Sequence, residues 1–457
     1  MILRWFLLCY ISIQSSGTDH DDFIILFLSQ PHAYLLSQLH DATRLIHSQQ
    51  HPLTQIFPHI KVSIVNSHDY ANNVTNWYSI YPLFSTLLTT FNNLKFLFIC
   101  EVETRVNLVK LVEFSKSLSR SVFVGHGLIN AQQSIIHHYS IIKDYYPDPS
   151  AGILISSDVL ALFVERDRQT SYSLKIGFII DTKFELAKMI SELTEVKMTD
   201  RSDLFCNQRQ PSPTCITWND WITYSCRSSN IRLIHIYFGI KTFYDFHQQR
   251  VSLLKRTWLS SLKNVNYNLF SNKKDPSFEN ILVLNDENTL IGHCHKTFSL
   301  LNYFNNTIND QQKYLVVVDD DTLVSVSRLL SMIQCFMLND DVPLVLGERY
   351  GYSTYPYPTA GSGMIFNRQA VKLIIEKCSC PEANTPDDMY IGICLQQLTI
   401  PLIHIKELHQ AQTIAYSSDW LKHQKPISFH KFDNIDVEYI YKTHLHETVV
   451  DTQKDEL

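Results

Sequence analysis

The sequence lacks three features that would each indicate a particular class of protein. After residue 13, no uninterrupted apolar run reaches roughly 18 residues, so we expect no membrane span. Basic residues are not in excess, because 39 Lys and Arg face 45 Asp and Glu, and the net charge of -6 argues against nucleic acid or an anionic membrane as partner. Cys378-Ser-Cys380 has no matching Cys or His pair at a zinc-site spacing, so disulfides are favoured over zinc.

The composition is that of a globular protein with more than one domain. Hydrophobic residues make up 45% of the chain and charged residues 18%, with many Tyr and Phe. A chain of 457 residues is longer than a single hydrophobic core usually supports. We therefore expect two domains.

Both ends of the sequence resemble targeting signals. Arg4, an apolar run over 5–13 and small residues up to Gly17 are typical of a secretory signal peptide, placed here at 1–17, with a short uncleaved anchor as the alternative. The last four residues, Lys454-Asp-Glu-Leu457, match an ER-retrieval signal that a receptor recognises. We therefore expect a protein of the ER lumen. Nine cysteines follow residue 17, and in that oxidising compartment they should form disulfides with at least one left over.

Short β-branched or aromatic runs alternate with longer helical patterns in both halves, which indicates an α/β fold. A segment with Pro, Cys and Trp but little periodicity separates them. We place this linker at 206–230, a first domain at 18–205 and a second domain at 231–450. Candidate strands are Phe23–Leu28, Lys61–Val65, Phe96–Cys100, Ser121–Val124, Gly152–Ile155, Ile231–Phe238, Ile281–Leu284, Tyr314–Val318, Leu344–Leu346 and Gly363–Phe366.

The two halves also resemble each other. Phe96-Leu-Phe-Ile-Cys-Glu-Val-Glu-Thr104 aligns without a gap with Tyr314-Leu-Val-Val-Val-Asp-Asp-Asp-Thr322, and an amphipathic helix is expected after each. The common order of these features indicates a duplication. Val102 interrupts the acidic triplet of the first copy, so we expect a degenerate, non-catalytic first domain that serves as scaffold or binds the acceptor. Three further echoes are Val122–Gly125 with Leu344–Gly347, Ala151-Gly152 with Ala360-Gly361, and Asp181–Ala187 with the segment from Asp387.

The triplet Asp319-Asp320-Asp321 is the strongest local signal for chemistry. It follows a Val-rich strand, at the sheet edge where open α/β folds bind ligands. Three adjacent carboxylates repel one another, and oxygen-only ligation favours Mn²⁺ or Mg²⁺ over zinc. Such a metal suits the diphosphate of a nucleotide-sugar. The alternative is a solvated acidic turn.

Four further segments occur in a fixed order around this triplet, and together they resemble the fringe-like inverting β-1,3-glycosyltransferases over roughly 231–441. The most similar members add glucose to O-linked fucose on thrombospondin type 1 repeats. The resemblance implies two tandem GT-A-like domains (nucleotide-sugar-binding, Rossmann-like), the first degenerate. The segments are Gly292-His-Cys-His-Lys-Thr297, Gly347-Glu-Arg-Tyr-Gly-Tyr352, Pro386-Asp-Asp-Met389 with Gly392 and Cys394, and Pro426-Ile-Ser-Phe-His-Lys431.

The resemblance assigns a role to each residue of the donor and metal side. Asp321 is the main metal ligand, assisted by Asp319 and His430, while Asp320 faces the ribose or nucleotide. Thr242 and Arg250 lie near the uridine and diphosphate. Lys296 is a second phosphate-binding candidate, and an exposed helix position is its alternative.

The acceptor side carries the predicted general base. By resemblance, Asp388 takes the proton from the fucose 3-hydroxyl. Its neighbour Asp387, placed at the acceptor, either raises the pKa of the base or caps the following helix, and the choice between the two acids stays open. Gly361 and Gly363 let the backbone approach a sugar, although the family has a longer glycine run here. Tyr352, in a Tyr-rich loop, contacts the acceptor or packs internally.

The expected function is therefore transfer of glucose from UDP-glucose, with Mn²⁺ (or Mg²⁺), to O-fucosylated thrombospondin type 1 repeat proteins. One alternative is a fringe-type β-1,3-N-acetylglucosaminyltransferase, which the ER-retrieval signal and the extra domain disfavour. Another is a non-catalytic ER lectin or folding factor, which the intact acidic triplet together with Asp388 disfavours.

Overall fold

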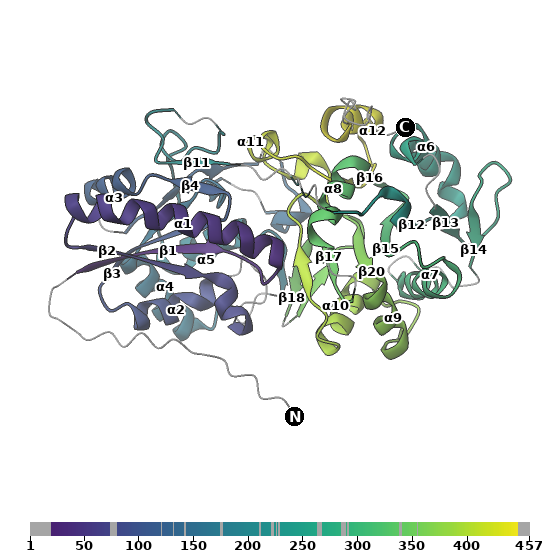
Figure 1. Cartoon of the computed structure of the whole chain (residues 1–457), viewed down its shortest axis with the longest axis horizontal. Coiled ribbons are helices and arrows are strands. Elements are labelled where there is room, and N and C mark those ends of the chain that lie inside the picture. The colour runs from purple at the N-terminus through teal and green to yellow at the C-terminus, as the bar shows by residue number, and fades with distance from the viewer. Residues whose placement is uncertain are drawn as a thin grey trace.

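The computed structural model describes two α/β domains that lie side by side, the first in purple and blue and the second in green and yellow (Figure 1). The predicted signal segments, 1–17 and 454–457, lie outside the described residues. These residues are 20–446, apart from 74–79, 120, 131, 141–142, 174–176, 210–211, 221–223, 225, 227–228, 263–266, 285–288, 290–291, 338–340 and 354.

The first domain contains a six-stranded sheet in the order β2-β1-β3-β8-β5-β10. Neighbouring strands are parallel except on either side of β8, which is antiparallel to both β3 and β5. The strands are β1 (Asp21–Leu28), β2 (Ile60–Asn66), β3 (Leu94–Glu101), β5 (Phe123–Gly125), β8 (Ile153–Ser156) and β10 (Thr199–Asp200).

The second domain contains a seven-stranded sheet in the order β14-β13-β12-β15-β20-β17-β21. Here β20 is the strand antiparallel to both neighbours, β15 and β17. The strands are β12 (Ile236–Lys241), β13 (Tyr267–Ser271), β14 (Ile281–Val283), β15 (Tyr314–Asp319), β17 (Val345–Gly347), β20 (Met364–Asn367) and β21 (Leu402–His404).

The two sheets share one topology. The series β2, β1, β3, β8, β5, β10 repeats as β13, β12, β15, β20, β17, β21, with the same parallel or antiparallel sense at every step. This confirms the predicted pair of tandem GT-A-like domains. One detail of the predicted alignment is wrong. The sequence pattern aligned Gly152 with Gly361, but in the structure Gly152 corresponds to Gly363. Both glycines directly precede the antiparallel strand of their sheet, and both have a positive φ, +89° and +104°.

Four smaller sheets are also present within the described residues. In the first domain β4 (Thr104–Val106) pairs with β11 (Thr217–Asn219), and in the second β16 (Thr322–Val324) pairs with β22 (Ser428–His430). The strand β9 (Phe178–Ile179) of the first domain joins the hairpin of β18 (Arg349–Tyr352) and β19 (Tyr355–Pro358) in the second. The last pair is β6 (Gly127–Leu128) with β7 (Tyr146–Pro147).

Helices cover both faces of each sheet (Figure 1). Successive side chains of a strand point to opposite sides, so a strand of apolar residues needs a layer of helices on each face. In β12, Ile236 and Phe238 join one core while Tyr237 joins the other, and β1 divides its residues in the same way. The helices are α1 (Ala33–Ile56), α2 (Tyr81–Thr90), α3 (Leu108–Ser117), α4 (Ser157–Thr170), α5 (Thr182–Thr194), α6 (Ser252–Arg256), α7 (Cys294–Thr307), α8 (Val326–Phe336), α9 (Arg368–Lys377), α10 (Asp387–Gln397), α11 (Ser418–Lys422) and α12 (Val437–Ile440). Within the described residues, no helix combines the length and apolar character needed to cross a bilayer.

The cysteines form disulfides, as expected. Cys378 and Cys380 bond to different partners, which agrees with the preference for disulfides over a zinc site. Cys100, buried in β3, is the free cysteine of the described residues. The four bonds are Cys206–Cys215, Cys226–Cys335, Cys294–Cys380 and Cys378–Cys394.

All ten predicted strands overlap an observed strand, and the differences that remain have local causes. The strand predicted to begin at Ile231 begins at Ile236, because residues Leu233–His235 form a 3₁₀ turn before it. The prediction missed β13, whose sequence Tyr-Asn-Leu-Phe-Ser mixes polar and apolar residues without a clear period.

Candidate functional site

The acidic triplet occupies the turn between β15 and β16, at the carboxyl end of a buried strand. The side chain of Thr322 stabilises this turn: its Oγ1 accepts from the Asp319 amide at 3.3 Å and donates to the Gly361 carbonyl at 2.8 Å. The buried Trp258 indole donates to the Thr322 carbonyl at 3.0 Å. The carboxylates therefore project from a turn that is held on both sides.

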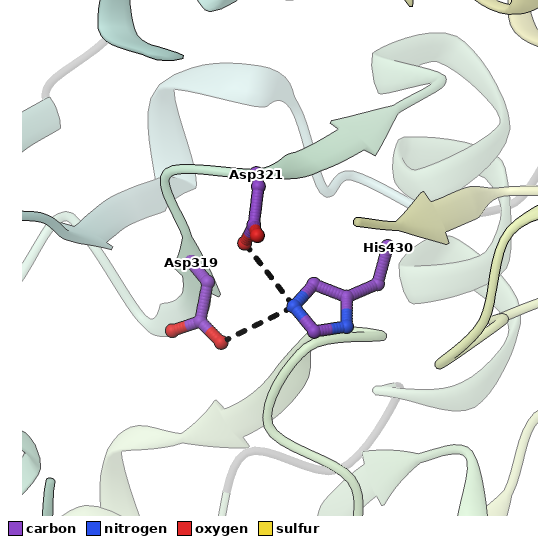
Figure 2. A group of neighbouring side chains, drawn as sticks. All are labelled: Asp319, Asp321 and His430. Carbon is purple, nitrogen blue, oxygen red and sulfur yellow. Dashed lines mark ion pairs between the residues drawn. The ribbon is translucent and has the colours of Figure 1, made fainter. Parts of the chain in front are cut away.

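Asp319, Asp321 and His430 form a metal-type donor group (Figure 2). His430 Nε2 lies 3.1 Å from Asp321 Oδ1 and 3.7 Å from Asp319 Oδ2. The pairing of β16 with β22, which sets Thr322 opposite His430, brings the histidine to the triplet. The donor atoms lie within 4.8 Å of one another, so one divalent ion can contact all three.

The orientation of the His430 ring is determined by its second nitrogen. Nδ1 lies 3.0 Å from the carbonyl oxygen of Gln410, which only accepts, so Nδ1 carries the hydrogen and Nε2 faces the carboxylates. Gly361 packs against the same ring. The sequence predicted that Gly361 lets the backbone approach a sugar. In the structure Gly361 also contacts the ring of His430.

Asp320 points to the opposite side of the turn and is buried. Its carboxylate accepts from Thr242 Oγ1 at 2.6 Å and pairs with Arg250 at 3.0 Å. Burial, together with the neighbouring Asp321, raises the pKa of Asp320 to about 6, although Thr242 and Arg250 oppose the shift. Arg250 projects from a π-helical turn (η6, His247–Val251) and also reaches Asp321 at 3.0 Å.

A lysine that sequence reasoning missed connects the triplet to the predicted acceptor side. Lys241, the last residue of β12, places Nζ 3.0 Å from Asp319 and 2.6 Å from Asp387. Asp387 also accepts from Thr297 at 2.6 Å. Its burial alone would raise the pKa of Asp387, but Lys241 and Thr297 hold that pKa below its usual range. The position of Lys241 at the ligand-binding end of a strand was the signal available in the sequence.

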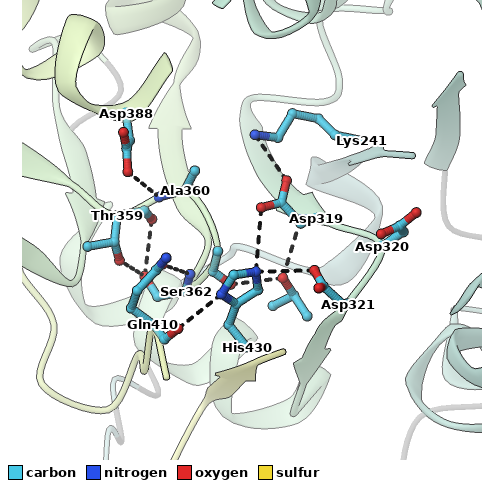
Figure 3. A network of polar contacts seen from close by, with 12 residues as sticks. Lys241, Asp319, Asp320, Asp321, Thr359, Ala360, Ser362, Asp388, Gln410 and His430 are labelled. Atoms are coloured by element: carbon cyan, nitrogen blue, oxygen red, sulfur yellow. Dashed lines mark hydrogen bonds and ion pairs between the residues drawn. The ribbon is translucent and has the colours of Figure 1, made fainter. Parts of the chain in front are cut away.

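Asp388 has a different environment from its neighbour Asp387. Figure 3 shows the carboxylate of Asp388 beside Ala360. It lies half-buried in the first turn of α10, where its carboxylate accepts from the Met389 amide at 2.7 Å and the Ala360 amide at 3.4 Å. Burial, and then the charge of Asp387, raise the pKa of Asp388 above its usual range. An acid with a raised pKa is suited to proton transfer near neutral pH.

The cleft beside the triplet has a volume of about 630 Å³, within the range of small-molecule sites. Lys296 lies at its wall and donates to the Thr242 carbonyl at 2.7 Å, so it is a buried helix residue and not an exposed one. Tyr352, Gly361, Gly363, Asp387 and Asp388 are not among the lining residues. The predicted residues that do line the cleft are Thr242, Arg250, Lys296, Asp319, Asp320, Asp321 and His430.

Comparison with known proteins places this geometry in a family. The fringe-like family model matches residues 231–451. A human β-1,3-glucosyltransferase is 34% identical and covers 97% of this chain and 89% of its own length, and the mouse enzyme is 32% identical over 96% and 90%. The zebrafish (Danio rerio) β-1,3-N-acetylglucosaminyltransferase manic fringe is 25% identical over 39% of this chain and 56% of its own. The glucosyltransferases thus align with both domains.

Proposed function

We propose, because the chain belongs to the β-1,3-glucosyltransferase family, that it transfers glucose from UDP-glucose, with inversion, to O-linked fucose on folded thrombospondin type 1 repeats. The relatives establish that the chain is a hexosyltransferase. The identities of the donor, the acceptor and the metal ion are our proposal. The observation that carries the proposal is the loop 360–361, which contacts Asp388 through the Ala360 amide and His430 through Gly361. Acid and metal-type donors thus flank one loop.

The residues at the triplet fit a divalent ion such as Mn²⁺. Two carboxylates and one imidazole whose Nε2 faces them are a donor set for Mn²⁺ or Mg²⁺, and Gly361 leaves the space that the imidazole occupies. Asp319, Asp321 and His430 would hold the ion. When bound, it supplies positive charge to the diphosphate of the donor.

The chain's own residues prepare both reactants. Arg250, Thr242 and Lys296 line the donor side of the cleft and support the diphosphate and nucleotide. Asp388 accepts the proton of the fucose 3-hydroxyl while that oxygen attacks the anomeric carbon of glucose, and the bond from this carbon to the diphosphate oxygen breaks, which releases UDP. Asp387 holds Lys241 and acts as a positioning residue, which favours Asp388 over Asp387 as the base.

An aromatic strip leads from the base to the first domain and suits a fucosylated polypeptide. Tyr355 and Tyr357 belong to β19, which packs against α10, the helix that carries Asp388 in its first turn. Tyr355 contacts Tyr352 at 6.0 Å between centroids, and Tyr352 contacts Phe178 at 4.5 Å. Phe178 belongs to the first domain and is 41% exposed. Aromatic rings of this kind bind the apolar faces of sugars and side chains.

The proposed domain plan is a non-catalytic first domain at 18–205, a linker at 206–230 and a catalytic second domain at 231–450. The four disulfides support an oxidising compartment, and the retrieval signal at 454–457 supports the ER lumen, with the retrieval receptor as a partner.

A donor panel on the purified protein tests this function. We expect transfer from UDP-glucose to a fucosylated repeat, loss of transfer on chelation and recovery with Mn²⁺. Asp388→Asn should lower kcat by roughly 10²–10⁴-fold while UDP binding persists. Turnover with UDP-N-acetylglucosamine instead would indicate a fringe-type enzyme, and metal-independent binding without turnover would indicate a lectin.

A further inference from the structure

The shared topology identifies what the first domain has at the position of the metal group. In the two small antiparallel pairs, Thr104 faces Asn219 as Thr322 faces His430. The gap-free match of β3 with β15 places Glu101 at the position of Asp319, and Glu103 at that of Asp321. The first domain therefore has two carboxylates and an amide where the second has two carboxylates and an imidazole.

The residue that packs against the imidazole in the second domain is also different in the first domain. Thr104 Oγ1 donates to the Ser150 carbonyl at 2.8 Å, just as Thr322 Oγ1 donates to the Gly361 carbonyl at 2.8 Å. Ser150 thus stands where the second domain has Gly361, and Asn219 donates to the same Ser150 carbonyl at 3.0 Å. A histidine ring packed as His430 is would collide with the Ser150 side chain.

A lysine of the second domain reaches the two glutamates. Lys406 Nζ lies 2.6 Å from Glu101 Oε2 and 2.8 Å from Glu103 Oε1. All three side chains are nearly inaccessible, with 12%, 4% and 10% exposure. The remaining cavity measures about 40 Å³, against about 630 Å³ at the cleft of the second domain. No nucleotide fits a space of that size.

The segment that carries Lys406 also supports the metal-type histidine. The Glu407 carbonyl accepts from the Ile427 amide at 2.7 Å, just before β22, and the Gln410 carbonyl accepts from His430 Nδ1 at 3.0 Å. Upstream, the Gln30 side chain of the first domain pairs with both backbone groups of His404, at 2.8 and 3.0 Å. The first domain thus holds one end of a segment whose other end orients His430.

We propose that the former metal centre of the first domain now binds the Lys406 ammonium in place of a metal ion, and that this contact positions the segment that orients His430. Lys406 is a positioning residue, since other residues line the cleft and its segment reaches His430 through the Gln410 carbonyl. The degenerate domain thereby serves the catalytic one. The second half of this inference rests on the metal site proposed above.

Metal stoichiometry tests the first half. Wild type should bind about one equivalent of Mn²⁺ in equilibrium dialysis. Lys406→Ala, purified in Mn²⁺, should bind about two, because Glu101 and Glu103 regain a position for a cation. The extra equivalent should disappear when Glu101→Gln and Glu103→Gln are added. A wild type that binds two equivalents, or a folded Lys406→Ala that binds one, would overturn the substitution of ammonium for metal.

A charge-neutral variant tests the positioning role. Lys406→Met with Glu101→Gln and Glu103→Gln leaves no unpaired charge among these three residues, so its melting temperature should stay within a few degrees of wild type. Its Mn²⁺ affinity should nevertheless fall roughly 10-fold, in the range found for residues behind metal ligands. Lys406→Arg should retain most of the affinity, and Lys197→Met, in the exposed pair with Asp144, should retain all of it.

The outcomes separate the two hypotheses. If wild type binds Mn²⁺ and the neutral triple variant binds it equally well, the positioning role is wrong and the proposed function stands. If wild type binds no Mn²⁺, both fail. Should Lys406→Ala not fold, the Mn²⁺ stoichiometry of wild type decides the first half, and the triple variant decides the second.

Discussion

The imidazole of His430 lies directly against the backbone of Gly361. A methyl group at Gly361 would come within 2.3 Å of His430 Nδ1 and 2.4 Å of Cε1, far inside van der Waals contact. The backbone of Gly361 does not have a positive φ, so the glycine is needed for space and not for conformation.

Substitution of Gly361 should therefore weaken the binding of the metal ion. We expect Gly361→Ala to turn the ring of His430 away from the carboxylates and to weaken Mn²⁺ binding by about 10–100-fold. Titration followed by electron paramagnetic resonance measures this affinity. Gly177→Ala is the control, because a methyl group there would meet nothing within 4 Å. Unchanged Mn²⁺ affinity in Gly361→Ala would contradict the role of the contact.

The buried Lys241 should be important for stability as well as for the site. Lys241→Met leaves Asp319 and Asp387 without their shared ammonium, and loss of one partner from a buried ion pair costs about 3–5 kcal/mol. Denaturant unfolding should show this loss. Adding Asp387→Asn should restore part of it, because one buried charge is then removed. Lys377→Met, which disrupts an exposed pair with Glu376, should leave stability nearly unchanged.

The pH dependence of transfer should reflect the raised pKa of Asp388. The base works only when ionised, so kcat/KM should fall as pH drops through a pKa that burial and Asp387 hold above the usual value of about 3.9. Asp387→Asn removes the neighbouring negative charge and should shift the acid limb of the profile to lower pH. An acid limb that stays in place or moves upward would show that another group controls it.

Glu348 should make stability depend on pH in the opposite direction from a paired carboxylate. Burial raises its pKa to about 8, so the folded protein binds a proton that the unfolded chain releases above about pH 4.5. Stability should therefore fall as pH rises from about 4.5 to 8. Glu348→Gln keeps an oxygen for the Gln410 amide and Thr359, and should melt at higher temperature than wild type at pH 7.5 but not at pH 5. Parallel melting curves at both pH values would refute this.

The aromatic strip should distinguish protein acceptors from small ones. Phe178→Ala removes an exposed ring from the first domain, and we expect roughly a 5–10-fold higher KM for a fucosylated repeat, as for a moderate interface contact. The KM values for UDP-glucose and for an aryl fucoside should not change. Tyr139→Ala, at another exposed aromatic of the first domain, is the control. An equal loss with both acceptors would argue against a docking surface.

Local patterns in the sequence were sufficient for the fold class and for part of the site. A Val-rich run followed by Asp319-Asp320-Asp321 predicts a buried strand that ends in carboxylates, because both the strand and the turn are contiguous in sequence. The repeat was visible for the same reason, since β3 and β15 keep residues of the same type, apolar and then acidic, in the same order. The order of the motifs along the chain was sufficient to recognise the family.

Only the tertiary structure decided how these groups are used. Lys241 and Asp387 are 146 residues apart, and Lys406 and Glu101 are 305 apart. Their contacts depend on strand register, on the crossing of helices and on how two domains pack, and no local periodicity contains that information. The sequence alone therefore determined which chemical groups lie at the strand ends of each domain. Packing decided that the carboxylate pair of the second domain borders a cleft, whereas Lys406 closes off the pair of the first domain. A buried carboxylate needs such a counter-charge, and only the assembled fold brings it within reach.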